Sequence, residues 1–222
     1  MHCIVTAGPT YETMDNVRRL TNFSTGRLGT ELANFLASKG HDVTLLIGEQ
    51  ATYCGERRVK RIEIFTTTED LRKKLKTLSA SSAKSAGAVF HAAAVSDFTF
   101  GKIWLRSASG RLTEIKSGKI STRSGTLLAE LVPTPKIIAE LRKFFPSARI
   151  VGWKYEVDGN RADVVKKAVQ QIRENKTDAS VANGKAYGTG FGIVTDSGEA
   201  VHFRDVKKLF AALEEFVRRL RR

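Results

Sequence analysis

The stretch 5–29 constrains the fold most, because a strand, a break and a helix start follow one another closely within it. A short apolar strand opens the stretch, and the glycine and proline at 8–9 do not allow regular structure to continue. Apolar residues then recur at helical spacing, and Ser24 or Thr25 is a suitable N-cap for a helix that ends near Lys39. The sequence therefore predicts a strand, a long polar loop and a capped helix, in that order.

This arrangement is typical of an anion-binding site. The first backbone N–H groups of a helix have no partner within the helix, and they lie at the positive end of the helix dipole. Three cationic side chains, Arg18, Arg19 and Arg27, belong to the same stretch. We therefore expect a phosphate or another anion at the start of this helix, with a purely structural turn as the alternative.

Two common phosphate-binding motifs are absent. The dinucleotide motif needs G-x-G-x-x-G directly after the strand, whereas Gly8 is followed by no glycine before Gly26. The P-loop needs G-x-x-x-x-G-K-[ST], whereas Gly118-Lys119 is followed by Ile120. The sequence thus indicates a nucleotide or phosphate site of a less common kind.

Strands and helices alternate along the rest of the chain. Strand-like apolar runs occupy 42–47, 59–65, 86–94, 126–132, 149–155 and 179–182, and a β-hairpin is expected at 190–203. Helices are predicted at 68–78, 135–144, 160–175 and 205–221. This order predicts a single α/β domain over 1–222, a three-layer sandwich of a mostly parallel sheet with helices on both faces. Ligands of such sheets collect beyond the carboxyl ends of the strands, here at 6–8 and 93–98.

The segment 98–125 interrupts this alternation. It is long, polar and rich in glycine and serine, and such a segment within a compact domain is usually a lid-like or hairpin insertion. Its cationic side chains could close over phosphates, or they could lie on a solvated hairpin: Lys102, Lys116, Lys119 and Arg123. Asp97 directly precedes the segment, where it could contact a ligand or cap a turn.

Charge and composition exclude several classes of function. The net charge of +14 arises from 37 Lys and Arg against 23 Asp and Glu. The basic residues are spread along the chain and are not interleaved with aromatic residues, which argues against nucleic-acid binding. No stretch approaches the roughly 20 apolar residues of a membrane span. Two cysteines make no disulfide framework, and no residues show metal-ligand spacing. We expect a cytoplasmic protein.

Several short motifs match one protein family when they are taken together. They are Thr6-Ala7-Gly8-x-Thr10, Asp15-x-Val17-Arg18, Asn22-x-Ser24-x-Gly26-x-x-Gly29, Ala92-Ala93-Ala94-Val95-Ser96-Asp97, Lys119-Ile120, Pro135, Gly152-Trp153-x-x-Glu156, Ala182-Asn183 and Phe191-Gly192. On these residues the chain resembles the phosphopantothenate–cysteine ligase family over essentially its whole length. The glycine-containing block near the N-terminus and the alanine-rich block are specific because they occur together.

The resemblance implies a Rossmann-like fold, a homodimer and a step of coenzyme A biosynthesis. In that family CTP or ATP activates the carboxylate of 4′-phosphopantothenate as an acyl-nucleotide and releases pyrophosphate. The amine of cysteine then attacks the acyl-nucleotide, giving 4′-phosphopantothenoylcysteine and a nucleoside monophosphate. Magnesium accompanies the triphosphate, and no protein residue is expected as a metal ligand.

The resemblance also implies roles for individual residues. Asn22, Lys119 and Arg18 correspond to catalytic residues, with Asn22 holding the acyl-nucleotide and Lys119 meeting the phosphates. Nucleotide contacts are implied for Gly8, Ser24, Gly26, Ala94, Asp97, Trp153 and Phe191, and substrate contacts for Arg18, Asn22, Ala94 and Asn183. The chemistry agrees with these roles, because a carboxylate and a triphosphate repel each other and must be brought together by positive charge and oriented donors.

The chain departs from the family pattern in three places. Arg27-Leu28 replaces a lysine-containing pair, Ser121-Thr122-Arg123 stands where more lysines are usual, and Ile193-Val194-Thr195-Asp196 follows Phe191-Gly192 where aspartate and asparagine are usual. The segment 153–156 resembles a lysine-containing version seen in eukaryotic and some stand-alone bacterial members. Both nucleotides therefore stay open, with CTP favoured.

Two further expectations follow. Many members are fused behind a flavin-dependent decarboxylase domain, whereas this chain begins directly at the ligase strand, so we expect no flavin. The alternative is an NAD(P)-dependent reductase, against which the missing G-x-G-x-x-G motif and the lack of a Tyr-x-x-x-Lys pair both count. A non-catalytic binding protein with the same fold is a third possibility, and the retention of Asn22, Arg18 and Lys119 argues against it.

Overall fold

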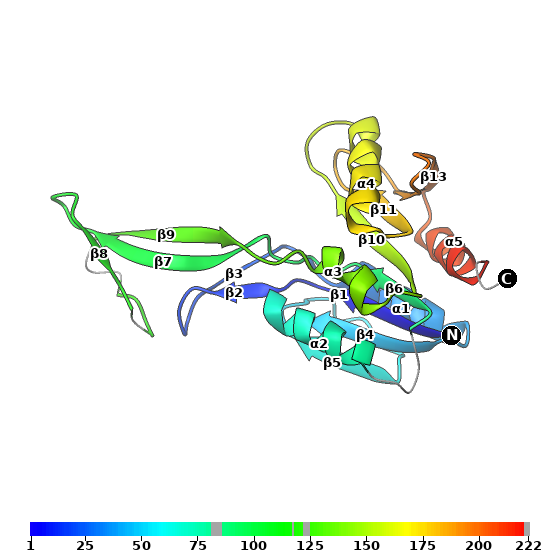
Figure 1. Ribbon diagram of the computed structural model, residues 1–222, viewed down its shortest axis with the longest axis horizontal. Helices are drawn as coiled ribbons and strands as arrows, with labels where there is room; N and C mark the ends of the chain where they lie inside the picture. The colour runs from blue at the N-terminus through cyan, green and yellow to red at the C-terminus, as the bar shows by residue number, and fades with distance from the viewer. Residues whose placement is uncertain (81–85, 117, 122–124, 220–222) are drawn as a thin grey trace.

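An eight-stranded sheet forms the core of the main domain, which lies on the right in Figure 1. The computed structural model describes residues 1–80, 86–116, 118–121 and 125–219. The strands of the sheet are β1 (His2–Ala7), β4 (Asp42–Gly48), β5 (Arg61–Phe65), β6 (Ala88–His91), β10 (Arg149–Tyr155), β11 (Ala179–Asn183), β12 (Phe191–Val194) and β13 (Ala200–Phe203). Their order across the sheet is β13-β12-β11-β10-β6-β1-β4-β5.

The strands from β5 to β11 are parallel, and only the hairpin β12–β13 is antiparallel. Both the mostly parallel sheet and the terminal hairpin confirm the expectation from the sequence. The chain builds the sheet outward from β1 in one direction through β4 and β5, and then in the other through β6, β10 and β11. The strand order reverses between β1 and β6, and ligands of such sheets bind at the carboxyl ends of the strands at this switch point.

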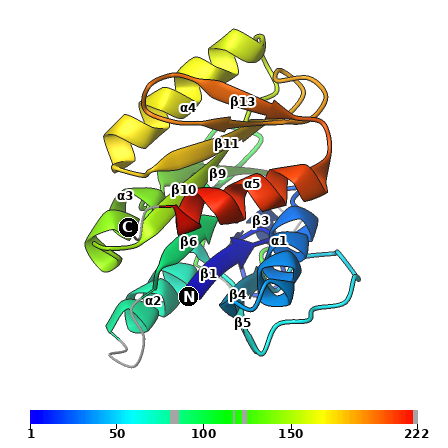
Figure 2. The ribbon, with the colours of Figure 1, turned by 90° about the vertical axis from the view of Figure 1, so that its right-hand side faces the viewer.

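Helices cover both faces of the sheet (Figure 2). On one face lie α1 (Arg27–Ser38) and α5 (Val206–Arg218), and on the other lie α2 (Thr68–Ala80), α3 (Ile137–Phe144) and α4 (Arg161–Asn175). Strand β1 is buried throughout, with Val5 packed in the α1 and α5 layer and Ile4 in the α2 and α3 layer. The fold is therefore the expected Rossmann-like three-layer sandwich. None of the described helices is long and apolar enough to cross a membrane.

The start of α1 differs from the sequence prediction. Its N-cap is Gly26, in the left-handed region at φ +78°, and no side chain caps the helix. The predicted cap by Ser24 or Thr25 was wrong; the Thr25 hydroxyl accepts only a weak bond of 3.3 Å from the Arg27 amide. By contrast, Asn160 caps α4 in a capping box with Asp163.

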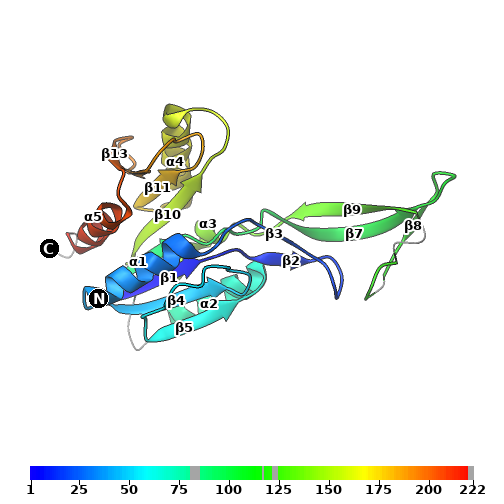
Figure 3. The same cartoon turned by 180° about the vertical axis from the view of Figure 1, so that it is seen from behind.

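A second, smaller sheet projects from the domain (Figure 3). It is antiparallel and consists of β7 (Phe98–Arg106), β8 (Leu112–Glu114) and β9 (Thr126–Pro133), in the order β8-β7-β9. The extension expected at 98–125 thus continues through β9, which pairs with β7 and not with the central sheet. Arg123, one of the cations predicted to reach phosphates, lies outside the described residues.

A short hairpin lies inside the polar loop that follows β1. Its strands are β2 (Tyr11–Thr13) and β3 (Arg19–Thr21), which the sequence analysis did not predict. Strand β2 contacts β7, so the hairpin packs beside the projecting sheet. The connection from β1 to α1 is consequently much longer than the tight turn of a dinucleotide-binding fold, which counts against the reductase alternative.

Candidate functional site

Two glycines meet at the centre of the site. Gly8 follows β1 at φ +79°, and Gly26 precedes α1 at φ +78°, a conformation that L side chains rarely adopt. A Cβ at Gly26 would lie 3.3 Å from the Gly8 Cα, and a Cβ at Gly8 would lie 2.9 Å from the Ala51 Cβ. A side chain at either position would therefore be crowded, and the positive φ disfavours it further. The first turn of α1 carries no acidic residue and no side-chain cap, so its amides can meet an anion.

The loops after β1 and β6 are joined by backbone hydrogen bonds. The Ala94 amide donates to the Gly8 carbonyl at 3.0 Å, and the Thr10 amide donates to the Ala94 carbonyl at 3.1 Å. The Asn22 side chain completes the junction, because its Nδ2 donates to the Ala94 carbonyl at 3.1 Å and to the Val95 carbonyl at 3.2 Å. Four of the residues predicted from the sequence, Gly8, Asn22, Gly26 and Ala94, thus come together at the switch point of the sheet.

A buried histidine supports this junction and was missed by the sequence analysis. His91 ends β6, and its Nδ1 lies 2.9 Å from the Thr6 hydroxyl, which also accepts a bond of 3.1 Å from the Ala93 amide. Burial lowers the pKa of His91 to about 4, so the ring is neutral near neutral pH. Because Ala93 directly precedes Ala94, this network fixes the loop that receives Asn22. A histidine within an otherwise small and apolar strand was the only signal available.

Three other predicted residues lie on the neighbouring strands β10, β11 and β12. Trp153 and Phe191 are half-buried and pack against the same core cluster as α1, while Asn183 ends β11 beside them. The Trp153 Nε1 and the Asn183 Oδ1 are buried without a hydrogen-bond partner in the described part of the chain. Buried polar groups of this kind are costly, so a bound ligand that pairs with them would be favoured. Two further predicted residues differ in exposure, since Ser24 is half-buried and Asp97 is exposed.

Arg18 and Lys119 form a separate, outer group. Arg18 Nη2 donates to the carbonyl of Ile120, the residue that follows Lys119, at 2.8 Å. Asp15 forms an ion pair with Arg18 Nη1 at 3.2 Å and accepts a hydrogen bond from the Ile120 amide at 3.2 Å. Strand β3 separates Arg18 from Asn22, which places their Cα atoms about 13 Å apart along an extended chain. Arg18 therefore lies one short strand away from Asn22 along the chain.

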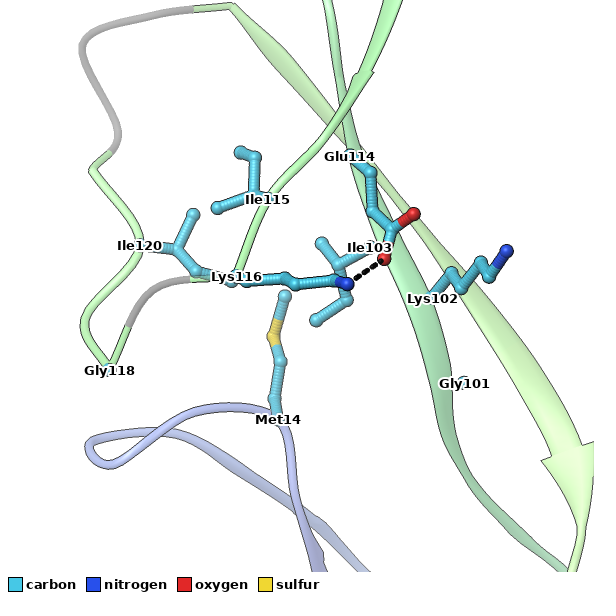
Figure 4. Close-up of a pocket in the computed structure, with 9 residues that line it drawn as sticks. All are labelled: Met14, Gly101, Lys102, Ile103, Glu114, Ile115, Lys116, Gly118 and Ile120. Atoms are coloured by element: carbon cyan, nitrogen blue, oxygen red, sulfur yellow. Dashed lines mark ion pairs between the residues drawn. The ribbon is translucent and has the colours of Figure 1, made fainter.

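A shallow cavity lies beside this outer group (Figure 4). Its volume is about 450 Å³, and Met14 from the β2–β3 hairpin faces Ile103, Ile115 and Ile120 of the extension across it. Lys116 pairs with Glu114 at 3.6 Å at its margin. The cavity thus lies between the tip of the hairpin and the extension.

The lysine at 154 lies on the other face of the sheet. Lys154 and Lys167 of α4 both pair with Glu156, at 3.0 and 2.6 Å. The hydrogen bond from Lys167, followed by that from Lys154, holds the pKa of the Glu156 carboxyl below its usual range. This ion pair ties β10 to α4, and it gives Lys154 a structural partner on the side of the sheet opposite Trp153.

Comparison with protein families identifies a match over most of the chain. The model of the DNA/pantothenate metabolism flavoprotein C-terminal domain matches residues 1–213. The coenzyme A biosynthesis bifunctional protein CoaBC of Thermococcus kodakarensis is 33% identical over 187 residues, which are 84% of this chain and 42% of that protein. The chain thus spans about half the length of the curated relatives that it matches.

Solved structures show the same architecture. The DNA/pantothenate metabolism flavoprotein from Streptococcus pneumoniae superposes with a TM-score of 0.84 at 25% identity, covering 98% of each chain. A mutant of Cab2 in complex with phosphopantothenate-cysteine superposes with a TM-score of 0.70 at 19% identity, covering 97% of this chain and 87% of that one, which shows the fold. By the family match and the identity to its relatives, this chain belongs to the family of the DNA/pantothenate metabolism flavoprotein C-terminal domain.

Proposed function

We propose that the chain is a phosphopantothenate–cysteine ligase of coenzyme A biosynthesis. It would activate the carboxylate of 4′-phosphopantothenate with CTP or ATP and then join the activated acyl group to the amine of cysteine. Family membership supports this proposal, as does the name of the CoaBC relatives, which assigns them to coenzyme A biosynthesis. The flavin chemistry that the family name mentions has no part in it.

One observation carries the proposal: the Asn22 side chain bridges to the loop after β6 at the switch point of the sheet. Its two bonds to Ala94 and Val95 hold the amide beside Gly8 and the uncapped start of α1. An amide can donate and accept hydrogen bonds without adding charge. The Asn22 amide thereby joins the two loops without adding negative charge, which suits a site for an anionic acyl-nucleotide.

The surrounding residues can divide the chemistry between them. In the first step a carboxylate oxygen attacks the α-phosphorus and pyrophosphate leaves, while the amides at the start of α1 and the glycine backbone at Gly8 and Gly26 bind phosphate oxygens. In the second step the cysteine amine attacks the acyl carbon and the nucleoside monophosphate leaves. Arg18 and Lys119 would offset the negative charge of the first step. No protein nucleophile is needed, because positioning and electrostatic stabilisation suffice.

Trp153, Asn183 and Phe191 would hold the organic parts of the ligands. The unpartnered Trp153 Nε1 can donate a hydrogen bond, and the unpartnered Asn183 Oδ1 can accept one. We assign Trp153 and Phe191 to the nucleotide and Asn183 to phosphopantothenate. CTP remains the favoured nucleotide.

Magnesium enters the proposal with the triphosphate. Within the described residues no three His, Cys, Asp or Glu side chains converge to hold a metal ion. Mg²⁺ commonly binds through substrate phosphates with few protein ligands, so such a cluster is not required.

The proposal includes a homodimer. The projecting sheet exposes large apolar side chains, namely Phe98, Leu112, Leu128 and Leu131. A narrow sheet with this much exposed apolar surface is stabilised when another surface covers it. A second copy of the chain, as the resemblance to the ligase family implies, would provide that surface.

Pyrophosphate release tests the proposal. The purified protein is incubated with magnesium, 4′-phosphopantothenate and cysteine, and CTP and ATP are compared in parallel. We expect release that depends on phosphopantothenate, with one nucleotide preferred. A folded protein that releases no pyrophosphate with either nucleotide would refute the ligase assignment.

A further inference from the structure

The carboxylate of Asp15 connects the β2–β3 hairpin, next to Arg18, with the part of the extension that contains Lys119. Asp15 lies at the tip of the β2–β3 hairpin, and its side chain is fully buried. One oxygen, Oδ1, accepts the amides of Val17 and Arg18 at 2.8 and 2.7 Å. The other oxygen, Oδ2, accepts the Ile120 amide at 3.2 Å, from a residue 105 positions away. Asp15 thus uses one oxygen for its own turn and the other for the extension.

Arg18 binds both Asp15 and the backbone of Ile120. Its guanidinium pairs with Asp15 Oδ2 at 3.2 Å and donates to the Ile120 carbonyl at 2.8 Å. Both backbone polar groups of Ile120 are therefore bound by this acid–base pair. A further bond of 2.9 Å runs from the Asn16 amide to the Gly118 carbonyl, so backbone groups on both sides of Lys119 are bound to the hairpin.

Charge and packing reinforce this clamp, which we define as Asp15, Arg18 and Ile120. The hydrogen bond from the Val17 amide, and to a lesser degree those from Ile120 and Arg18, hold the pKa of the Asp15 carboxyl below its usual range. Asp15 is therefore ionised at neutral pH and can accept all of its hydrogen bonds. The Ile120 side chain is 3% exposed and lines the cavity opposite Met14. Lys119, between two fixed neighbours, is itself exposed.

We propose that Asp15 is a positioning residue, which holds segment 118–121 against the β2–β3 hairpin so that Lys119 is presented to the triphosphate. The inference rests on the proposed function for the ligand that Lys119 meets, and on the described contacts for the clamp itself. Asp15 does not touch substrate in this role. It acts by reducing the number of conformations that the backbone around Lys119 can adopt before the phosphates arrive.

Asp15→Asn separates the two tasks of the carboxylate. The asparagine keeps an oxygen for the amides of Val17 and Arg18, because asparagine forms the same type of turn. Its NH2 group then replaces Oδ2 and faces the Ile120 N–H, donor against donor, so the bond to segment 118–121 is lost. Asp205→Asn is the matched control, since Asp205 accepts the Lys208 amide at the start of α5 on the central domain.

Amide hydrogen exchange tests the clamp without any substrate. We expect exchange in segment 118–121 to be about tenfold faster in Asp15→Asn, because one lost hydrogen bond to a charged group accounts for at least that factor. Exchange there should be unchanged in Asp205→Asn. Equal exchange in the wild type and in Asp15→Asn would overturn the proposal. This readout also decides the clamp if the wild-type chain shows no ligase activity, in which case the proposed function alone would fail.

Kinetics then test whether the clamp acts through Lys119. We expect Asp15→Asn to lower kcat/KM for the nucleotide about tenfold and to leave KM for cysteine unchanged, because cysteine reacts after the phosphate contacts have been used. In a Lys119→Gln background the same change should lower kcat/KM by less than about twofold, since residues that act as a unit are not additive. Losses that multiply in the double variant would show that Asp15 acts by another route.

Discussion

The side-chain amide of Asn22 lies 3.1 Å from the carbonyl oxygen of Ala94, a residue 72 positions further along the chain. This bond links the loop before α1 with the loop after β6. Asn22→Asp would replace a donor by a carboxylate oxygen that faces the carbonyls of Ala94 and Val95. We expect pyrophosphate release to fall roughly 10²-fold, because repulsion between the carboxylate and these carbonyls would displace the loops that position the ligands. Asn34→Asp, on the outer side of α1, is the control. Wild-type turnover in Asn22→Asp would refute its assigned role.

Lys119→Gln tests the cation assigned to the phosphates. The substitution removes the charge but retains much of the side chain, so we expect the rate of pyrophosphate release to fall about tenfold or more, as for other lost charge contacts in transition states. KM for cysteine should change little. Lys116→Gln is the matched control, because Lys116 belongs to the same extension and is paired with Glu114. A normal rate in Lys119→Gln together with a slow Lys116→Gln would reassign the role to Lys116.

Gly26→Ala tests the close approach at the start of α1. Gly26 and Gly40 share a φ near +80°, but a Cβ at Gly40 meets no atom within 4 Å, whereas one at Gly26 lies 3.0 Å from both Ala51 and Ile47. Each alanine should lower the free energy of unfolding by about 1–2 kcal/mol for its backbone conformation. Gly26→Ala should cost more, and it should also raise KM for the nucleotide. Equal midpoints in denaturant would show that the contact with Ala51 relaxes freely.

The lowered pKa of His91 predicts how the free energy of unfolding depends on pH. This pKa is lowered to about 4 in the folded chain, from an ordinary value of 6.5, so the unfolded state binds more protons between these values. Stability should therefore fall as the pH falls through this window, and His91 should contribute about 2 kcal/mol of the loss between pH 8 and pH 5. Denaturant unfolding of the wild type and of His91→Gln at both pH values isolates this contribution. The pH dependence of unfolding should be weaker in the variant by about that amount; an unchanged dependence would contradict the prediction.

Leu131→Glu tests the homodimer. Leu131 is 49% exposed on β9, and a charge there would oppose burial of the extension against a second copy. Light scattering of the wild type should give about twice the chain mass of 24.5 kDa, and the variant should give the mass of a single chain. Val201→Glu, at an exposed position of β13, should remain a dimer. A monomeric wild type would remove the homodimer from the proposed function.

Local patterns in the sequence determined most of the elements. Apolar runs and helical periodicity predicted the strands and helices of the central domain. They could do so because the spacing of apolar residues follows the period of the helix or strand that buries them. Glycine and proline at 8–9 and the glycine at 26 indicated the end of β1 and the start of α1, because these residues interrupt regular structure. The start of α1 was mispredicted because propensity favours Ser24 and Thr25 as caps, whereas the close approach of Gly8 and Gly26 decides where the helix begins.

The tertiary structure alone decided which of these residues meet. Strand order places β1 beside β6, and this pairing brings Gly8, Asn22 and Ala94 together across the sheet. The pairing of β7 with β9 makes a predicted loop into an extension, and Asp15 bonds both to Arg18 and to Ile120, the neighbour of Lys119. No local pattern encodes these contacts, because they depend on the partners that each strand and loop finds far along the chain.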